Sequence, residues 1–370
     1  MLRRMSVEVI VNPVHPEGLQ ACERVQALCA RTGVPVRVRP TSIARPYGNP
    51  APEAALTVVI GGDGTLREVA GALVGAPGWR GALLPVPTGT ADLFALNVGI
   101  RRTADGLRVL EDVLGGEVTS RSVIHCDLGW ATLERAGGGA SAGGTASVGG
   151  RTSAEQPFLV TAGIGHSGGA LLRTPGWAKD VGGAAGYGVG ALTRLTASPL
   201  PVTVSAGEGA DRVDRDLGVW AVEFGNISHI PYGITVFPHG GVRTGELAGL
   251  LVVPSSGREE SSAGAWSSVG ARPSTGTKPC VRTGSVARTV LGARSVPAAR
   301  TVPSWGRIFQ AGICGGHERV DDLDLMSVTS ARVRSIRPLP VHLDGEAAGL
   351  VTSLQVRVAP EALPVVVPNR

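Results

Sequence analysis

The sequence predicts an α/β domain with a parallel sheet, followed by an antiparallel, β-sandwich-like domain. Three observations support this. The length of 370 residues allows two domains. Strand and helix signals alternate through residues 1–120, which is typical of a parallel sheet with helices on its faces. From residue 121 onward, short β-rich runs separated by turn residues dominate, and such runs favour antiparallel pairing.

The elements of the first domain follow from local patterns. Residues 6–11 (SVEVIV) and 56–60 (LTVVI) are apolar runs of strand length. Apolar residues recur at helical spacing over 19–29, and Thr32-Gly33 ends this helix. The remaining elements predicted for this domain are strands at 34–38 and 82–86 and helices at 65–75, 91–98 and 103–114.

The second domain, placed at 121–358, is predicted mainly from β-rich runs. Residues 134–156 are rich in Gly, Ser and Ala, and residues 256–304 are rich in Ser, Arg and Pro. The apolar residues of these two segments show no helix or strand period. We expect both to be flexible insertions. Strands are expected at 122–133, 158–162, 202–205, 218–224, 247–253, 324–336 and 354–358, and a helix is expected at 187–195.

The charge distribution excludes a broad basic surface. The formal net charge is +5, and residues 256–304 alone contain six Arg, one Lys and two Glu. The rest of the chain is therefore neutral overall, and we expect no nucleic-acid partner. The five cysteines are scattered without a CxxC pair, and no apolar stretch reaches the length of a membrane span. These features predict a cytoplasmic protein with reduced thiols.

The strongest local signal is Gly61-Gly62-Asp63-Gly64-Thr65, which lies between a predicted strand and a predicted helix. Glycines allow a ligand to approach the backbone closely, and the N–H groups at a helix start bind anions such as phosphates. A carboxylate beside phosphates requires a cation or a hydroxyl donor between them, so Asp63 indicates Mg²⁺-nucleotide chemistry. In the alternative interpretation, Asp63 merely caps its helix.

Two further segments carry polar groups in turns. Pro87-Thr88-Gly89-Thr90-Ala91 follows the next predicted strand, so its loop should line the same crevice at the carboxyl ends of the strands. Near the C-terminus, the turn Asp344-Gly345-Glu346 places two carboxylates two residues apart, which suits a base and an orienting partner. An exposed hairpin turn is the alternative for this turn, because Asp-Gly is a common hairpin dipeptide.

Taken together, these motifs resemble the diacylglycerol kinase catalytic family, the bacterial soluble lipid kinases related to sphingosine kinases and NAD kinases. The resemblance is carried by GGDGTLREV, PTGTADLFALNVGI, GIGHSGGALL, GNISHIPYGITVFPHGGVRTGEL and PLPVHLDGEAAG…PEALPVVVPN. It implies an ATP-binding α/β domain at 1–120, to which residues 359–370 return, and a lipid-substrate domain at 121–358. It also implies ATP and Mg²⁺ as cofactors and transfer of the γ-phosphate to a lipid hydroxyl, with diacylglycerol as the default acceptor.

The resemblance also assigns roles to individual residues. Glu346 would accept the proton of the lipid hydroxyl, with Asp344 beside it and Asp63 at the phosphates. No residue is expected to form a separate metal site, and such an enzyme of phospholipid metabolism would contact the inner face of a membrane. The residues that would contact ATP are Asn12, Thr41, Gly62, Asp63, Gly64, Thr65, Leu66, Arg67, Glu68, Gly89 and Thr90.

Several positions depart from the family pattern. Asp92 stands where the family has Asn, and Arg243-Thr244-Gly245 stands where it has a metal-holding Asp-Asp-Gly. A fixed positive charge from Arg243 could replace the ion there. His166, His229 and His239 lack the close spacing of a zinc site. Two alternatives stay open: an NAD kinase-like enzyme, because that family shares the GGDGT motif, or an inactive protein that binds lipid or nucleotide, because Arg243-Thr244 replaces the acidic pair.

Overall fold

The computed structural model describes residues 6–14, 16–42, 46–48, 50–117, 122–135, 155–173, 196–207, 212–254 and 303–369. The expected insertions at 134–156 and 256–304 lie outside these ranges except for their end residues. The helix expected at 187–195 lies outside them entirely.

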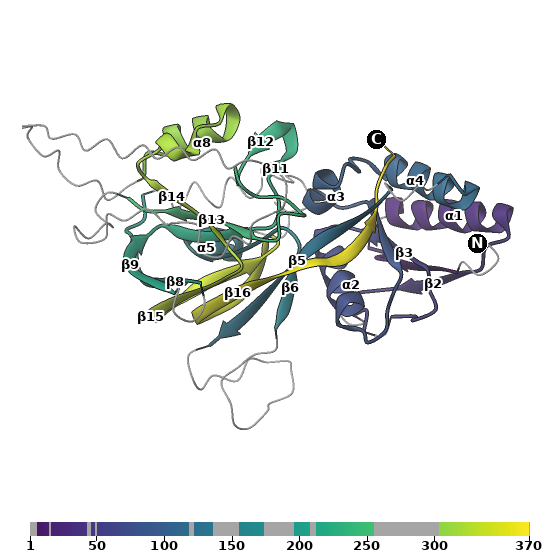
Figure 1. The fold of residues 1–370 in the computed structure, drawn as a ribbon, viewed down its shortest axis with the longest axis horizontal. Coiled ribbons are helices and arrows are strands. Elements are labelled where there is room, and N and C mark those ends of the chain that lie inside the picture. Colours follow the sequence, from purple (N-terminus) through teal and green to yellow (C-terminus); the bar gives the residue numbers. More distant parts are fainter. Residues whose placement is uncertain are drawn as a thin grey trace, which may run out of the picture.

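The first part of the chain forms a parallel sheet in the order β4-β3-β1-β2. β1, β3 and β4 are almost entirely buried because helices cover both faces of the sheet: α1 and α4 lie on one face and α2 on the other (Figure 1). The edge strand β2 is less buried and carries Arg37 and Arg39. The elements of this part are β1 (Val7–Val11), α1 (Pro16–Thr32), β2 (Val36–Pro40), β3 (Leu56–Gly61), α2 (Asp63–Gly75), β4 (Ala82–Pro87), α3 (Leu93–Asn97) and α4 (Thr103–Gly115).

In the second part, neighbouring strands pair antiparallel and enclose an apolar core of their own. The fold class expected from the sequence is thus confirmed. The strands are β5 (Val123–Glu134), β6 (Gln156–Phe158), β7 (Thr161–Gly165), β8 (Leu200–Ala206), β9 (Val213–Val219), β10 (Ala221–Gly225), β11 (His229–Ile230), β12 (Ile234–Thr235), β13 (Leu247–Val252), β14 (Leu323–Val328), β15 (Ser330–Leu343) and β16 (Glu346–Val366). The helices are α5 (His166–Arg173), α8 (Trp305–Cys314) and the short 3-10 turns η3 (Pro231–Gly233) and η5 (His317–Arg319).

One long strand joins the two parts. β16 pairs antiparallel with β15 and β5 along most of its length, and Val365 near its end pairs parallel with Leu83 of β4. A single sheet therefore runs through both parts in the order β14-β13-β10-β7-β15-β16-β4-β3-β1-β2. The hairpin turn between β15 and β16 lies next to the start of α2, since Glu346 at this turn approaches Gly64.

Candidate active site

Two glycine loops meet at the carboxyl ends of β3 and β4. A Cβ atom added to Gly89 would lie 2.5 Å from Cα of Gly62, and Thr88 N–H donates a hydrogen bond to Gly61 O at 3.2 Å. Only glycines allow the two backbones to come this close. The structure thus brings the two predicted loops together into one crevice.

The N-terminus of α2 opens into this crevice. The helix follows Gly62, whose backbone is extended and which has no side chain to cap the helix. The N–H groups of the first turn have no partner within the helix, and the helix dipole adds partial positive charge at this end. This end of α2 is therefore suited to hold a phosphate.

Asp63 bridges the two loops. Its carboxylate accepts hydrogen bonds from Leu93 N–H at 2.9 Å and Phe94 N–H at 3.1 Å. Asp63 therefore caps α3, not its own helix as the alternative interpretation supposed. Burial raises the pKa of Asp63, and the two N–H donors oppose this shift. The Asp63 carboxylate therefore fixes the loop that follows β4. It also lies where the sequence places the phosphates.

Asp92 adds a second carboxylate to the crevice. This residue has a left-handed backbone, with φ of 48°, and its Oδ1 accepts a hydrogen bond from Gly89 N–H at 3.2 Å. Burial and the neighbouring charge of Asp63 raise the pKa of Asp92 to about 7. The sequence showed Asp92 only as a departure from the family pattern, and its electrostatic coupling to Asp63 is visible only in the structure.

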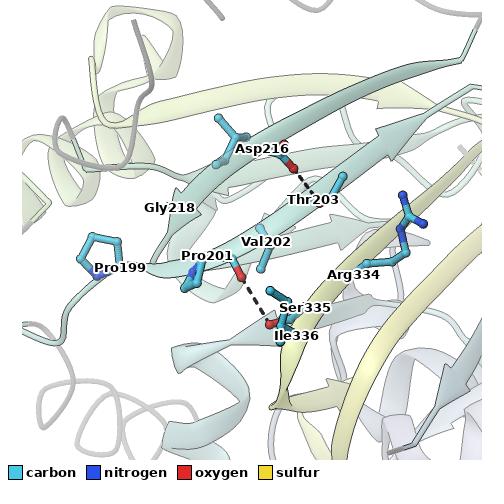
Figure 2. Close-up of a pocket in the computed structure, with 10 residues that line it drawn as sticks. Pro199, Pro201, Val202, Thr203, Asp216, Gly218, Arg334, Ser335 and Ile336 are labelled. Atoms are coloured by element: carbon cyan, nitrogen blue, oxygen red, sulfur yellow. Dashed lines mark hydrogen bonds between the residues drawn. The ribbon is translucent and has the colours of Figure 1, made fainter. Parts of the chain in front are cut away.

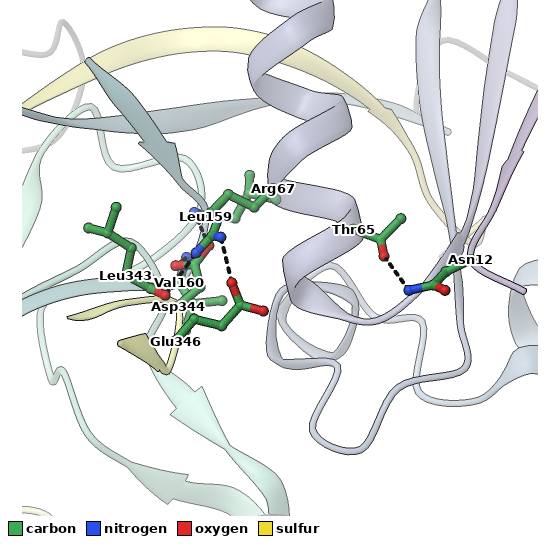
Figure 3. Close-up of polar contacts among 8 residues, drawn as sticks. All are labelled: Asn12, Thr65, Arg67, Leu159, Val160, Leu343, Asp344 and Glu346. Atoms are coloured by element: carbon green, nitrogen blue, oxygen red, sulfur yellow. Dashed lines mark hydrogen bonds and ion pairs between the residues drawn. The ribbon is translucent and has the colours of Figure 1, made fainter. Parts of the chain in front are cut away.

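The predicted contacts around β1 form the other side of the crevice. Asn12 Nδ2 donates to Thr65 Oγ1 at 3.3 Å (Figure 3). Thr41 is buried and its N–H donates to Val11 O at 2.8 Å, so it lies directly beside Asn12. The structure thus collects Asn12, Thr41 and Thr65, which come from three separate segments.

Other predicted contact residues lie differently. The Leu66 side chain is buried in the core, so it faces away from the crevice. Glu68 accepts a hydrogen bond from Tyr47 N–H, and burial raises its pKa. Thr90 is exposed at the second loop. The role of Tyr47 was not predicted, because nothing in its local sequence indicates a contact with α2.

The turn Asp344-Gly345 is a tight hairpin with both residues in the left-handed region, at φ of 48° and 77°. The Asp344 carboxylate accepts hydrogen bonds from Leu159 N–H at 2.9 Å and Val160 N–H at 2.8 Å (Figure 3). It also accepts one from Thr161 N–H at 2.9 Å. Burial raises the pKa of Asp344 to about 6, although Arg67 and these donors act in the opposite direction. With its oxygens engaged in this way, Asp344 holds the turn in place.

Glu346 reaches from this turn to the first domain. Its carboxylate lies 2.6 Å from Nη2 of Arg67 on α2, and Nη1 of Arg67 donates to Leu343 O at 2.9 Å (Figure 3). A Cβ atom on Gly64 would lie 2.6 Å from Oε1 of Glu346. The carboxylate of Glu346 therefore lies against the N-terminal end of α2, and its side chain is 56% exposed.

Residues 6–126 match the family model of the diacylglycerol kinase catalytic domain. This match confirms the resemblance seen in the sequence over this part of the chain. It covers the glycine loops and ends within β5, so the turn that carries Glu346 lies outside it. No curated protein matches the chain.

Solved structures of related fold agree with this match. A protein from Bacillus anthracis str. Sterne that is named as a proposed diacylglycerol kinase gives a TM-score of 0.59, and a diacylglycerol kinase structure from the same organism gives 0.54. Each is 16% identical, and the alignment covers 98% of this chain and 97% of the other. An NAD kinase from Archaeoglobus fulgidus in complex with ATP gives 0.44 at 12% identity, with 98% and 92% covered. These likenesses concern the fold.

The loop that in the diacylglycerol kinase family carries the metal-holding Asp-Asp-Gly has no acidic side chain at these positions here. Arg243 is exposed, Thr244 Oγ1 donates to Glu246 O at 2.7 Å, and Gly245 N–H donates to Asp127 Oδ2 at 2.7 Å. Across the described ranges, no three His, Cys, Asp or Glu side chains form a group that could hold a metal ion.

A groove of about 920 Å³ lies elsewhere in the second domain. It is bounded by β8, β9 and residues 334–336 of β15, and Thr203 donates a hydrogen bond to Asp216 at its wall (Figure 2). None of the predicted site residues lines it. The groove is therefore separate from the candidate active site.

Proposed function

We propose that this protein is an ATP-dependent kinase that phosphorylates the hydroxyl group of a lipid, with diacylglycerol as the default acceptor. One observation carries the proposal: Glu346 and the glycine loops lie far apart in the sequence, yet the Glu346 carboxylate contacts the phosphate-binding end of α2. The family match of residues 6–126 supports the kinase class.

In the proposed reaction, the first-turn N–H groups of α2 and the backbone of the two glycine loops hold the triphosphate. Asn12, Thr41 and Thr65 border the nucleotide. The lipid hydroxyl oxygen attacks the γ-phosphorus, the bond from this phosphorus to the bridging oxygen of ADP breaks, and the hydroxyl proton passes to Glu346. Arg67 orients Glu346 and ties the turn to α2.

The carboxylates of Asp63 and Asp92 fit a Mg²⁺ ion that enters with ATP. Mg²⁺ in proteins commonly takes one or two carboxylates, substrate phosphates and waters. Burial and the charge of Asp63 together raise the pKa of Asp92, and a bound cation would relieve the repulsion between the two carboxylates. When bound, the ion would neutralise developing charge on the phosphates.

The lipid acceptor implies contact with a membrane surface. In the described part of the chain, no helix is long and apolar enough to cross a bilayer. We therefore propose that the enzyme reaches its substrate as a peripheral protein at the inner face of the membrane.

The test is incubation of the purified protein with radiolabelled ATP, Mg²⁺ and a detergent-dispersed total lipid extract, followed by identification of the labelled product. We expect a labelled lipid with wild type and with the surface control Glu155→Gln, and at least about 100-fold less with Glu346→Gln. In a parallel incubation with NAD in place of the lipid extract, label in the dinucleotide would instead indicate an NAD kinase-like enzyme. ATP binding without any labelled product would indicate an inactive binding protein.

A further inference from the structure

A buried carboxylate and a buried imidazole meet across a strand of the second domain. Glu223 on β10 and His342 on β15 are both paired with Gly163 of β7, which lies between them in the sheet. Nε2 of His342 lies 3.1 Å from the Glu223 carboxylate. The side chains are only 6% and 15% exposed, respectively.

Gly163 makes this contact possible. Two strands separated by a third lie about 9.6 Å apart, so their side chains meet only by reaching over the middle strand. A Cβ atom on Gly163 would lie 2.1 Å from Oε2 of Glu223 and 2.3 Å from Nε2 of His342. The glycine therefore leaves the space in which the pair forms.

Each group of the pair favours the charged form of the other. Burial opposes both charges, but the attraction and hydrogen bond between the partners outweigh it. The pKa of Glu223 is therefore lowered and that of His342 is raised. Removing one partner takes away the attraction that offsets burial, so the charged form of the remaining group becomes unfavourable.

The pair is directly connected to the turn of the candidate active site. Thr161 Oγ1 donates to the Glu223 carboxylate at 3.2 Å. The backbone of Thr161 exchanges hydrogen bonds with Asp344, by Thr161 N–H to Oδ1 at 2.9 Å and by Asp344 N–H to Thr161 O at 2.7 Å. His342 precedes Asp344 by two residues. The pair thus links β7 and β15, the two strands that position the turn.

We propose that Glu223 and His342 are positioning residues that fix β7 and β15 so that Glu346 is held against the start of α2. This inference rests on the proposed function, because the group being positioned is the proposed base. Neither side chain is placed among the groups expected to contact ATP.

The test compares Glu223→Gln, His342→Gln and the double variant. We expect each single variant to lower kcat for lipid phosphorylation about 10- to 100-fold, because small displacements of a catalytic group have large effects, while KM for ATP changes less than about 2-fold. The double variant should regain most of this loss, since two amides can pair without buried charge.

The matched control is the ion pair between Arg215 on β9 and Asp324 on β14, whose side chains are 10% and 13% exposed. Arg215→Gln should lower the melting temperature about as much as Glu223→Gln does. Its kcat, measured below the unfolding transition, should equal that of wild type. If Glu223→Gln loses stability like this control but keeps its kcat, the pair is merely structural and the proposal is overturned.

Hydrogen exchange separates this proposal from the proposed function. The Asp344 amide, which donates to Thr161 O, should exchange faster in Glu223→Gln and His342→Gln than in wild type. Its exchange rate in Arg215→Gln should equal that of wild type. This result is expected even if wild type phosphorylates no lipid. Unchanged exchange at residues 342–346 in both single variants would refute the positioning role.

Discussion

At the scale of single residues, Asp92 sets a pH dependence of stability. Its pKa of about 7 in the folded protein lies above the ordinary value of 3.8, so between these pH values the folded state binds the proton more tightly than the unfolded chain. Stability therefore falls as the pH rises through this window. We expect the free energy of unfolding of Asp92→Asn to exceed that of wild type by about 1–3 kcal/mol at pH 8. At pH 4 the two values should be almost equal. Urea unfolding at both pH values tests this, and an equal gain at both would contradict it.

Asp63 combines two tasks, and its variants should show both. Asp63→Ala removes the acceptor for two N–H groups of α3, so we expect a loss of about 1–2 kcal/mol in stability. It should also lower kcat by about 100-fold or more, because the second loop moves and a charge near the phosphates is lost. Asp63→Asn keeps one acceptor oxygen and should be intermediate in stability. Full activity of Asp63→Ala with normal stability would refute both tasks.

Substitutions of the two carboxylates of the hairpin turn should differ in their effect on stability. Asp344→Asn places an amide against three N–H donors, so we expect its melting temperature to fall together with kcat. Glu346→Gln removes an exposed carboxylate whose partner is Arg67, so its melting temperature should stay within a few degrees of wild type while turnover is lost. If Glu346→Gln is active and Asp344→Asn is fully folded but inactive, the base is Asp344.

At the scale of elements, the contact between the two glycine loops can be tested sterically. Gly89→Ala would place a methyl group 2.5 Å from Cα of Gly62 and 2.7 Å from Oδ1 of Asp92. The loops must separate, so we expect KM for ATP to rise by about 10-fold, as misplacement of binding groups often causes. Gly75→Ala at the end of α2 is the matched control, because its added Cβ meets nothing within 4 Å. A similar KM in both variants would show that the loops need not touch.

The element scale also shows where sequence reasoning ends. The strands and helices of the first domain were predicted well, because each apolar run ends at a Gly, Pro or Asn. In the second domain, the strand expected at 218–224 is two strands, β9 and β10, which meet at Trp220. The strand expected at 158–162 is likewise divided, at 159–160, and the one at 324–336 is divided at Thr329. At 159–160 and at Trp220 the bend residues are apolar and buried, so periodicity gives no signal there. At Thr329 the bend is a single exposed residue between two strands, and one Thr is no turn signal. Helix α8 was also missed.

The candidate site shows the same limit. The glycine loops and the turn at 344–346 were recognisable because their chemistry lies in short motifs. The contact of Arg67 with Leu343 was not predictable, since the two residues are 276 positions apart and only the path of β16 brings them together. The same holds for the three N–H groups that hold Asp344, which belong to a bend with an apolar sequence.

At the scale of the whole molecule, the segment with the net charge is attached at one point of the second domain. Val253 N–H donates to Asp322 O at 2.8 Å, and Ser304 N–H donates to Asp322 Oδ2 at 2.6 Å. The two flanks of residues 256–302 therefore lie beside the same residue. A short Gly-Ser linker can join them without moving β13 or α8, so the segment can be removed while the rest of the fold is kept.

The final prediction concerns membrane binding by this segment. Its six Arg and one Lys outnumber its two Glu, and each basic residue near an anionic bilayer contributes about 1 kcal/mol, which salt weakens by screening. We expect deletion of 256–302 to reduce sedimentation with phosphatidylserine vesicles at low salt, and this difference should shrink at high salt. Turnover of a short-chain, detergent-dispersed lipid should stay close to wild type, because no residue of the candidate site is removed. A full-length variant with the seven basic residues replaced by Gln is the matched control, and it should bind vesicles as weakly as the deletion. If both variants sediment like wild type, the segment is a spacer and other surfaces bring the enzyme to its lipid.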